Sequence, residues 1–120
     1  MKVSESLLNQ FGDQVGGVFT PNESTTQGML RALDQAGLAG KFPFVGFDTN
    51  EALLQGLKDK KVSALAVQDP FQMGYTAVRN IFNSIQQKPF EANVDTGAVL
   101  LDLENLDTEE VQKIINPQGT

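Results

Sequence analysis

The fold is decided by the stretch Phe42-Pro43-Phe44-Val45-Gly46-Phe47-Asp48-Thr49-Asn50. Its first six residues are apolar and β-prone, and they predict a buried strand, since proline is tolerated at the start of a strand. Residues 48–50 then supply helix N-caps for Ala52, Leu53, Leu54 and Leu57, which recur at helical spacing. A buried strand that passes into a helix after three polar residues is typical of α/β proteins.

The same alternation continues on both sides of this stretch. Helices are predicted at about residues 3–11, 24–36, 70–87 and 109–115, and strands at 15–20, 62–67 and 94–101. Near-continuous apolar strands joined by short connections favour a parallel sheet that is buried on both faces. The sequence therefore predicts one α/β domain: a three-layer, largely parallel sheet with helices on both faces.

Composition excludes several classes of function. Nine Lys and Arg against fifteen Asp and Glu give the 120-residue chain a net charge of −6, the wrong sign for a protein that binds nucleic acid through its phosphates. The absence of Cys and His removes thiolate nucleophiles, imidazole bases and the usual zinc ligands, so we expect no enzyme, no cofactor and no metal. No apolar run is long enough for a membrane span, and residues 1–8 do not form a signal peptide.

Polar residues follow three successive predicted strands. In open parallel α/β sheets, ligands bind outside the carboxyl ends of the strands, and Asn22, Asp48 and Gln68 stand there. One carboxylate and two amides can accept and donate hydrogen bonds as vicinal hydroxyls do, but they supply no nucleophile with its base. Alternatively, Asn22, Asp48 and Asp69 are ordinary helix N-caps and Gln68 only solvates a sheet edge.

Three ordered blocks carry a family resemblance. They are Val18-Phe19-Thr20-Pro21-Asn22-Glu23-Ser24-Thr25-Thr26, then Val45-Gly46-Phe47-Asp48, then Ala66-Val67-Gln68-Asp69-Pro70. Together they resemble the C-terminal part of ribose-type periplasmic solute-binding proteins of ABC transporters, and the resemblance covers nearly the whole chain. It implies a flavodoxin-like half of a type I periplasmic binding protein, with a monosaccharide held by Asn22, Asp48 and Gln68.

The resemblance also implies a larger parent protein. Members of the family have two α/β lobes, and this chain is similar to a single lobe, so we expect a truncated fragment whose sugar binding is weak or absent. The parent would be periplasmic and would deliver its sugar to a transporter permease. Residues 69–93 would pack on the missing lobe; in this chain, the helix at 70–87 would either fold back onto its own sheet or pair with a second copy as a homodimer.

Two alternatives share the predicted architecture. The effector domain of a sugar-responsive transcription regulator has similar strand ends, and an upstream helix-turn-helix in the parent gene would distinguish it. A stand-alone flavodoxin-like signalling domain needs an acidic pair after its first strand and a late lysine at a strand end. Asn22-Glu23 matches the first requirement poorly, and no strand-end lysine follows Gln68.

Overall fold

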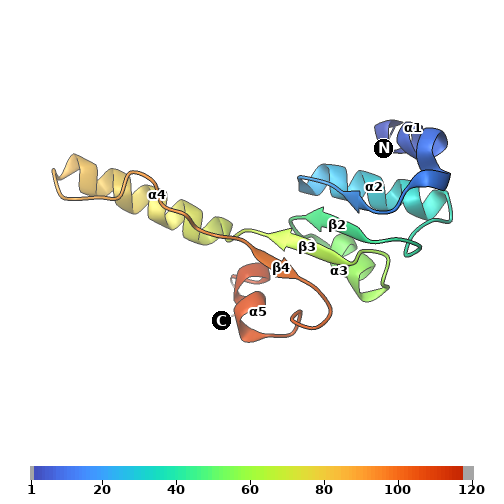
Figure 1. Ribbon diagram of the computed structural model, residues 1–120. Coiled ribbons are helices and arrows are strands. Elements are labelled where there is room, and N and C mark those ends of the chain that lie inside the picture. Colours follow the sequence, from blue (N-terminus) through green and yellow to red (C-terminus); the bar gives the residue numbers. More distant parts are fainter. Residues whose placement is uncertain (1, 118–120) are drawn as a thin grey trace.

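The chain alternates helices and strands in the predicted order in a computed structural model that describes residues 2–117. The elements are α1 (Lys2–Phe11), a 3-10 turn η1 (Gly12–Gln14), β1 (Val18–Phe19), α2 (Glu23–Gln35), β2 (Phe44–Phe47), α3 (Glu51–Lys58), β3 (Ala64–Val67), α4 (Pro70–Ile85), β4 (Val99–Leu101) and α5 (Glu109–Ile115). Figure 1 shows their arrangement.

The four strands form one sheet in the order β1-β2-β3-β4. The pairs β1–β2 and β2–β3 are parallel, whereas β4 runs antiparallel to β3, with Val99 opposite Val67 and Leu101 opposite Leu65. The predicted fold class, an α/β protein with a largely parallel sheet, is confirmed. The one antiparallel pair arises because the chain leaves the sheet through α4 and returns beside β3.

The hydrophobic core lies mainly on one face of the sheet. Phe44, Leu65 and Leu101 are fully buried on this face, in one cluster with apolar side chains of α2 and α3. The opposite face is more open, because alternate residues of a strand point to opposite sides. Phe19 and Leu100 lie on that side and are 62% and 55% exposed. Among residues 2–117, the covering layer of helices is therefore concentrated on one side.

Each long helix after α1 begins with a side-chain cap that follows a strand. The side-chain oxygens of Asn22, Asn50 and Asp69 accept hydrogen bonds from backbone N–H groups in the first turns of α2, α3 and α4. The corresponding distances are 3.0, 2.9 and 2.8 Å. Such caps satisfy N–H groups that have no partner within the helix. The polar residues after the strands therefore set the directions in which the helices leave the sheet.

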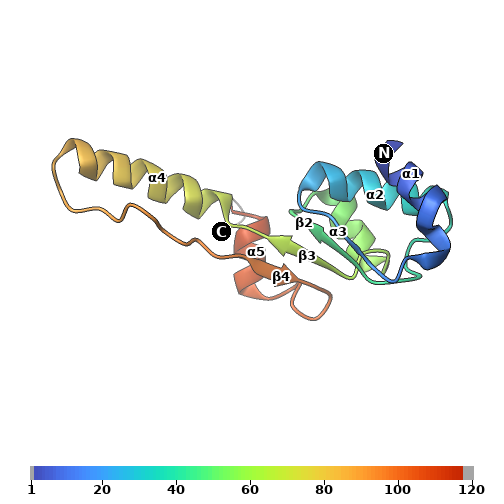
Figure 2. The ribbon, with the colours of Figure 1, turned by 45° about the horizontal axis from the view of Figure 1, so that its top comes forward.

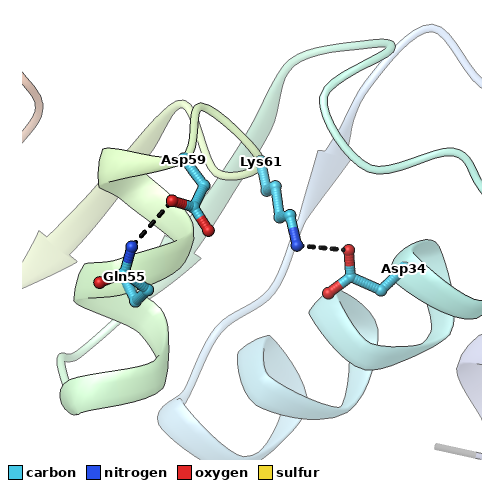
Figure 3. Close-up of polar contacts among 4 residues, drawn as sticks. All are labelled: Asp34, Gln55, Asp59 and Lys61. Atoms are coloured by element: carbon cyan, nitrogen blue, oxygen red, sulfur yellow. Dashed lines mark hydrogen bonds and ion pairs between the residues drawn. The ribbon is translucent and has the colours of Figure 1, made fainter.

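A pair of charged residues joins the C-terminal ends of two helical segments. Lys61, just beyond α3, lies 3.0 Å from the carboxylate of Asp34 on α2, while the Gln55 side chain donates to Asp59 at 2.8 Å (Figure 3). The hydrogen bond to Asp34 and the charge of that carboxylate raise the pKa of Lys61 above its ordinary value of 10.5. Because both side chains remain partly in water, the pair orients this end of the domain more than it stabilises it.

Helix α4 extends away from the rest of the molecule. Figures 1 and 2 show it as an arm beyond the sheet, with residues 86–98 returning alongside it. The radius of gyration is 17.7 Å, whereas a compact domain of this length has about 14 Å. The chain exposes 8108 Å², whereas a compact 13.0 kDa monomer exposes about 6,300 Å². Folding of this helix back onto its own sheet, one of the two predicted outcomes, is thus not observed.

Candidate functional site

The carboxyl ends of β1, β2 and β3 meet at one edge of the sheet. Asp48 follows β2 directly, Gln68 follows β3 directly, and Asn22 lies three residues beyond the end of β1. Asp48 and Gln68 both line one cleft of about 470 Å³, which also opens to α4 and α5. The structure therefore brings two of the three predicted site residues together in a cavity, while Asn22 stands at its edge and does not line it.

Asp48 has an unusual backbone. Its φ is 60°, in the left-handed region that residues other than glycine seldom adopt, and its amide donates to the Ala66 carbonyl at 2.8 Å. The interpretation of Asp48 as a helix N-cap is wrong, because Asn50 caps α3. Within residues 2–117, the Asp48 carboxylate makes no hydrogen bond to the protein. A strained residue with an unengaged carboxylate at a cleft is typical of a functional site.

Asn22 has a structural task. Its Oδ1 atom accepts from the Thr25 amide, the Thr25 hydroxyl and the Ser24 hydroxyl, at 3.0, 3.0 and 2.9 Å. The interpretation of Asn22 as the N-cap of α2 is therefore confirmed, as it is for Asp69 at α4. Three donors occupy the carbonyl oxygen, so any role in ligand binding falls to the amide N–H groups on Nδ2.

The cleft contains residues that the sequence did not single out. Glu23 lines it beside Asp48, and the Glu23 carboxylate accepts from the Asn50 side chain at 2.7 Å. Met73 of α4 and Ile114 and Ile115 of α5 form an apolar wall. The position of Glu23 directly after Asn22 was a usable signal. The contribution of α5 was not foreseeable from local sequence, because it depends on how β4 pairs with β3.

The chemistry of the cleft is that of a binding site for an uncharged polar ligand. Two carboxylates and an amide line it together with apolar side chains, and its lining includes neither lysine nor arginine. Among residues 2–117, no group of three or more His, Cys, Asp or Glu side chains is arranged to hold a metal ion. The same part of the chain has no helix with the length and hydropathy needed to cross a membrane.

Comparison with known proteins gives a consistent result. The chain is 34% identical over 77 residues to the ribose import binding protein RbsB of Bacillus subtilis (strain 168), an alignment that covers 64% of this chain and 24% of RbsB. An ABC transporter solute binding protein from Agrobacterium vitis, solved with bound D-fucose, has a TM-score of 0.89 and 33% identity, covering 95% of this chain and 39% of that chain.

A second solved structure agrees with these two. A carbohydrate transporter solute binding protein from Agrobacterium radiobacter, in complex with D-arabinose, has a TM-score of 0.88 and 31% identity, over 96% of this chain and 39% of that chain. The chain thus spans less than half the length of each of these relatives. Residues 1–89 match the model of the periplasmic binding protein domain. The chain therefore belongs to the periplasmic binding protein domain family, as the sequence blocks indicated.

Proposed function

We propose that the cleft at the carboxyl ends of β2 and β3 binds a neutral monosaccharide. The observation that carries the proposal is the carboxylate of Asp48, which is held at a strained backbone position, is free of protein partners and lies beside Gln68. Asp48 would accept from sugar hydroxyls, and the amides of Gln68 and Asn22 would donate to them or accept from them. A cleft lined by two carboxylates and no cation disfavours phosphorylated and acidic sugars.

Binding by this chain alone is expected to be weak. Three polar contacts contribute about 1 to 3 kcal/mol each, whereas association costs on the order of 4 to 15 kcal/mol. The balance allows at best millimolar dissociation constants for the isolated lobe. A full-length relative would add contacts from a second lobe, and we infer that the parent protein is an extracytoplasmic, non-catalytic component of sugar import that meets a permease of an ABC transporter. The printed functions of RbsB and the two solute binding proteins support this inference.

An amide-resolved NMR titration tests the sugar proposal. With ribose, glucose, galactose and xylose at up to tens of millimolar, we expect saturable shifts at Asn22, Asp48 and Gln68 for at least one sugar. The Asp48→Asn variant should lose this response by about tenfold in affinity, since it removes a charged acceptor while asparagine tolerates the left-handed φ.

The matched control is Asp13→Asn, which removes an exposed carboxylate of η1 outside the cleft. This variant should titrate as the unsubstituted chain does. Equal affinities of the Asp48 and Asp13 variants, or an unsubstituted chain that responds to no sugar, would contradict the proposed site.

We further propose that residues 69–93 pack on a second lobe in the parent protein. The support is the apolar surface of α4, where several large side chains are 41% to 77% exposed although they are of the kind that protein cores bury: Phe71, Met73, Tyr75, Val78, Ile81, Phe82 and Ile85. Contiguous exposed apolar surfaces of this kind mark interfaces. This surface is too large to be left in water by a stable monomeric protein, and the remaining length of the relatives supplies a natural partner.

Light scattering distinguishes this lobe-facing role from the homodimer. We expect the mass of one chain throughout the micromolar range, together with binding of a hydrophobic dye that decreases in the Ile85→Asp variant. Val3→Asp, which places the same charge on exposed α1, is the control. A mass of two chains that reverts to one in Ile85→Asp, but not in Val3→Asp, would instead assign the surface to a second copy.

A further inference from the structure

A single buried hydroxyl joins the ends of the first two strands. Thr26 lies in α2 and is 0% exposed, and its Oγ1 atom accepts from the Phe47 amide at 2.9 Å. The same hydroxyl donates to the Asn22 carbonyl at 2.7 Å and lies 2.8 Å from the hydroxyl of Thr20. The Phe47 carbonyl is more distant, at 3.2 Å.

These contacts use the full capacity of the hydroxyl. A threonine hydroxyl offers one donor and two acceptor positions. When its proton goes to the Asn22 carbonyl, its oxygen accepts from the Phe47 N–H and from the Thr20 hydroxyl, which leaves Thr26 with no spare group. A saturated polar network inside a protein fixes the relative positions of its members, since loss of one partner leaves the others unsatisfied in a buried place.

The network ties together the two segments that carry proposed ligand residues. Backbone pairing between β1 and β2 reaches the bond from the Thr20 amide to the Val45 carbonyl, at 3.1 Å. Beyond it, the Phe47 amide bonds to the side chain of Thr26. The turn with Asn22 can therefore leave the sheet while it remains connected to the residue directly before Asp48.

Steric fit holds the network from the other side. Gly46 precedes Phe47, and a Cβ atom at Gly46 would stand 2.2 Å from Cγ2 of Thr26 and 2.8 Å from Cδ2 of Leu65. Glycine is thus required for α2 to approach β2 closely enough for the Thr26 hydroxyl to reach the Phe47 amide. The side chain of Thr26 is confined by packing as well as by hydrogen bonds.

We infer that Thr26 is a positioning residue that sets the placement of Asn22 relative to Asp48, and through it the geometry of the site. Its consequence for ligand affinity rests on the proposed monosaccharide function, whereas its consequence for the geometry does not. Thr26 itself does not line the cleft.

The test compares Thr26→Val, which keeps the shape and removes the hydroxyl, with Thr26→Ser, which keeps the hydroxyl. Thr76→Val is the control, because it removes another buried threonine hydroxyl on α4. In ligand-free protein, amide hydrogen exchange at Phe47 is measured relative to that at Asp48, whose amide bonds to the Ala66 carbonyl. This ratio is insensitive to a general loss of stability, which accelerates both amides together.

In Thr26→Val, we expect exchange at Phe47 to accelerate about tenfold relative to Asp48, with shifted backbone resonances at Asn22 and Asp48. Thr26→Ser and Thr76→Val should keep the ratio found in the unsubstituted chain. In the sugar titration, Thr26→Val should weaken affinity by about tenfold and Thr26→Ser should restore it.

The outcomes separate the two proposals. An unchanged ratio and unchanged resonances in Thr26→Val overturn the positioning role. Loosened geometry with unchanged sugar affinity also overturns it, and leaves the sugar site standing. If the unsubstituted chain binds no sugar while Thr26→Val still loosens Phe47 and displaces the Asn22 and Asp48 resonances, the proposed function is wrong and the positioning role holds.

Discussion

Replacing Phe44 by alanine should lower the free energy of unfolding by about 3 to 5 kcal/mol. Phe44 is fully buried in the second strand of the sheet and belongs to the main hydrophobic cluster, so the substitution removes apolar contacts and leaves a cavity beneath the helices. Domains of this size have total stabilities of about 5 to 15 kcal/mol. Urea unfolding followed by circular dichroism measures the change.

Phe71→Ala is the matched control for this experiment. It deletes the same ring from α4, where the side chain is 65% exposed. We expect a change within about 0.5 kcal/mol in the isolated chain, as for most surface substitutions. Similar losses in the two variants would show that Phe44 does not lie in a packed core, and would contradict the arrangement of the sheet.

Two glycines should respond to alanine in opposite directions. Gly46→Ala places a methyl group against Thr26 and Leu65, and overpacking of this kind costs about 1 to 3 kcal/mol. Gly74→Ala, in the middle of α4, meets no atom within 4 Å and should stabilise the chain by about 0.5 to 1 kcal/mol through better helix propensity. Thermal unfolding of both variants gives the two signs directly.

The sign of the Gly46 effect is the informative part. Leu65 has a flexible side chain and can move away from an added methyl group, but Thr26 is held by its hydrogen bonds. A stabilised Gly46→Ala variant would mean that α2 lies farther from the sheet than the structure places it. The Gly74→Ala variant guards against a general effect of replacing glycine.

Much of the fold could be predicted because local sequence and tertiary structure agree. The run from Phe44 to Asn50 reads as strand, turn and helix cap, and each part forms as expected. Strand lengths were overestimated where a partner is missing. Residues 15–17 are β-prone, but β2 begins at Phe44, which pairs with Val18. Residues 94–98 likewise extend past Val67, the last residue of β3, so they find no strand to pair with.

The site was predictable in its location and less so in its composition. Asp48 and Gln68 follow from the rule that ligands bind at the carboxyl ends of parallel strands. Neither the left-handed backbone of Asp48 nor the wall formed by Ile114 can be deduced from neighbouring residues. The first depends on how β2 hands over to α3, and the second on a helix that returns from far along the chain.

The antiparallel pairing of β3 with β4 makes the α4 arm an insertion in the topological sense. Val67 and Val99 stand opposite one another, so the connection between them, residues 68–98, begins and ends at adjacent points of the sheet. It is equivalent to a greatly enlarged hairpin loop. The entropy of closing a loop grows only logarithmically with its length, so an arm of this size adds little to the cost of forming the sheet. The lobe and its arm can therefore change independently in evolution, with the sheet preserving the strand ends while the arm adapts to whatever it contacts.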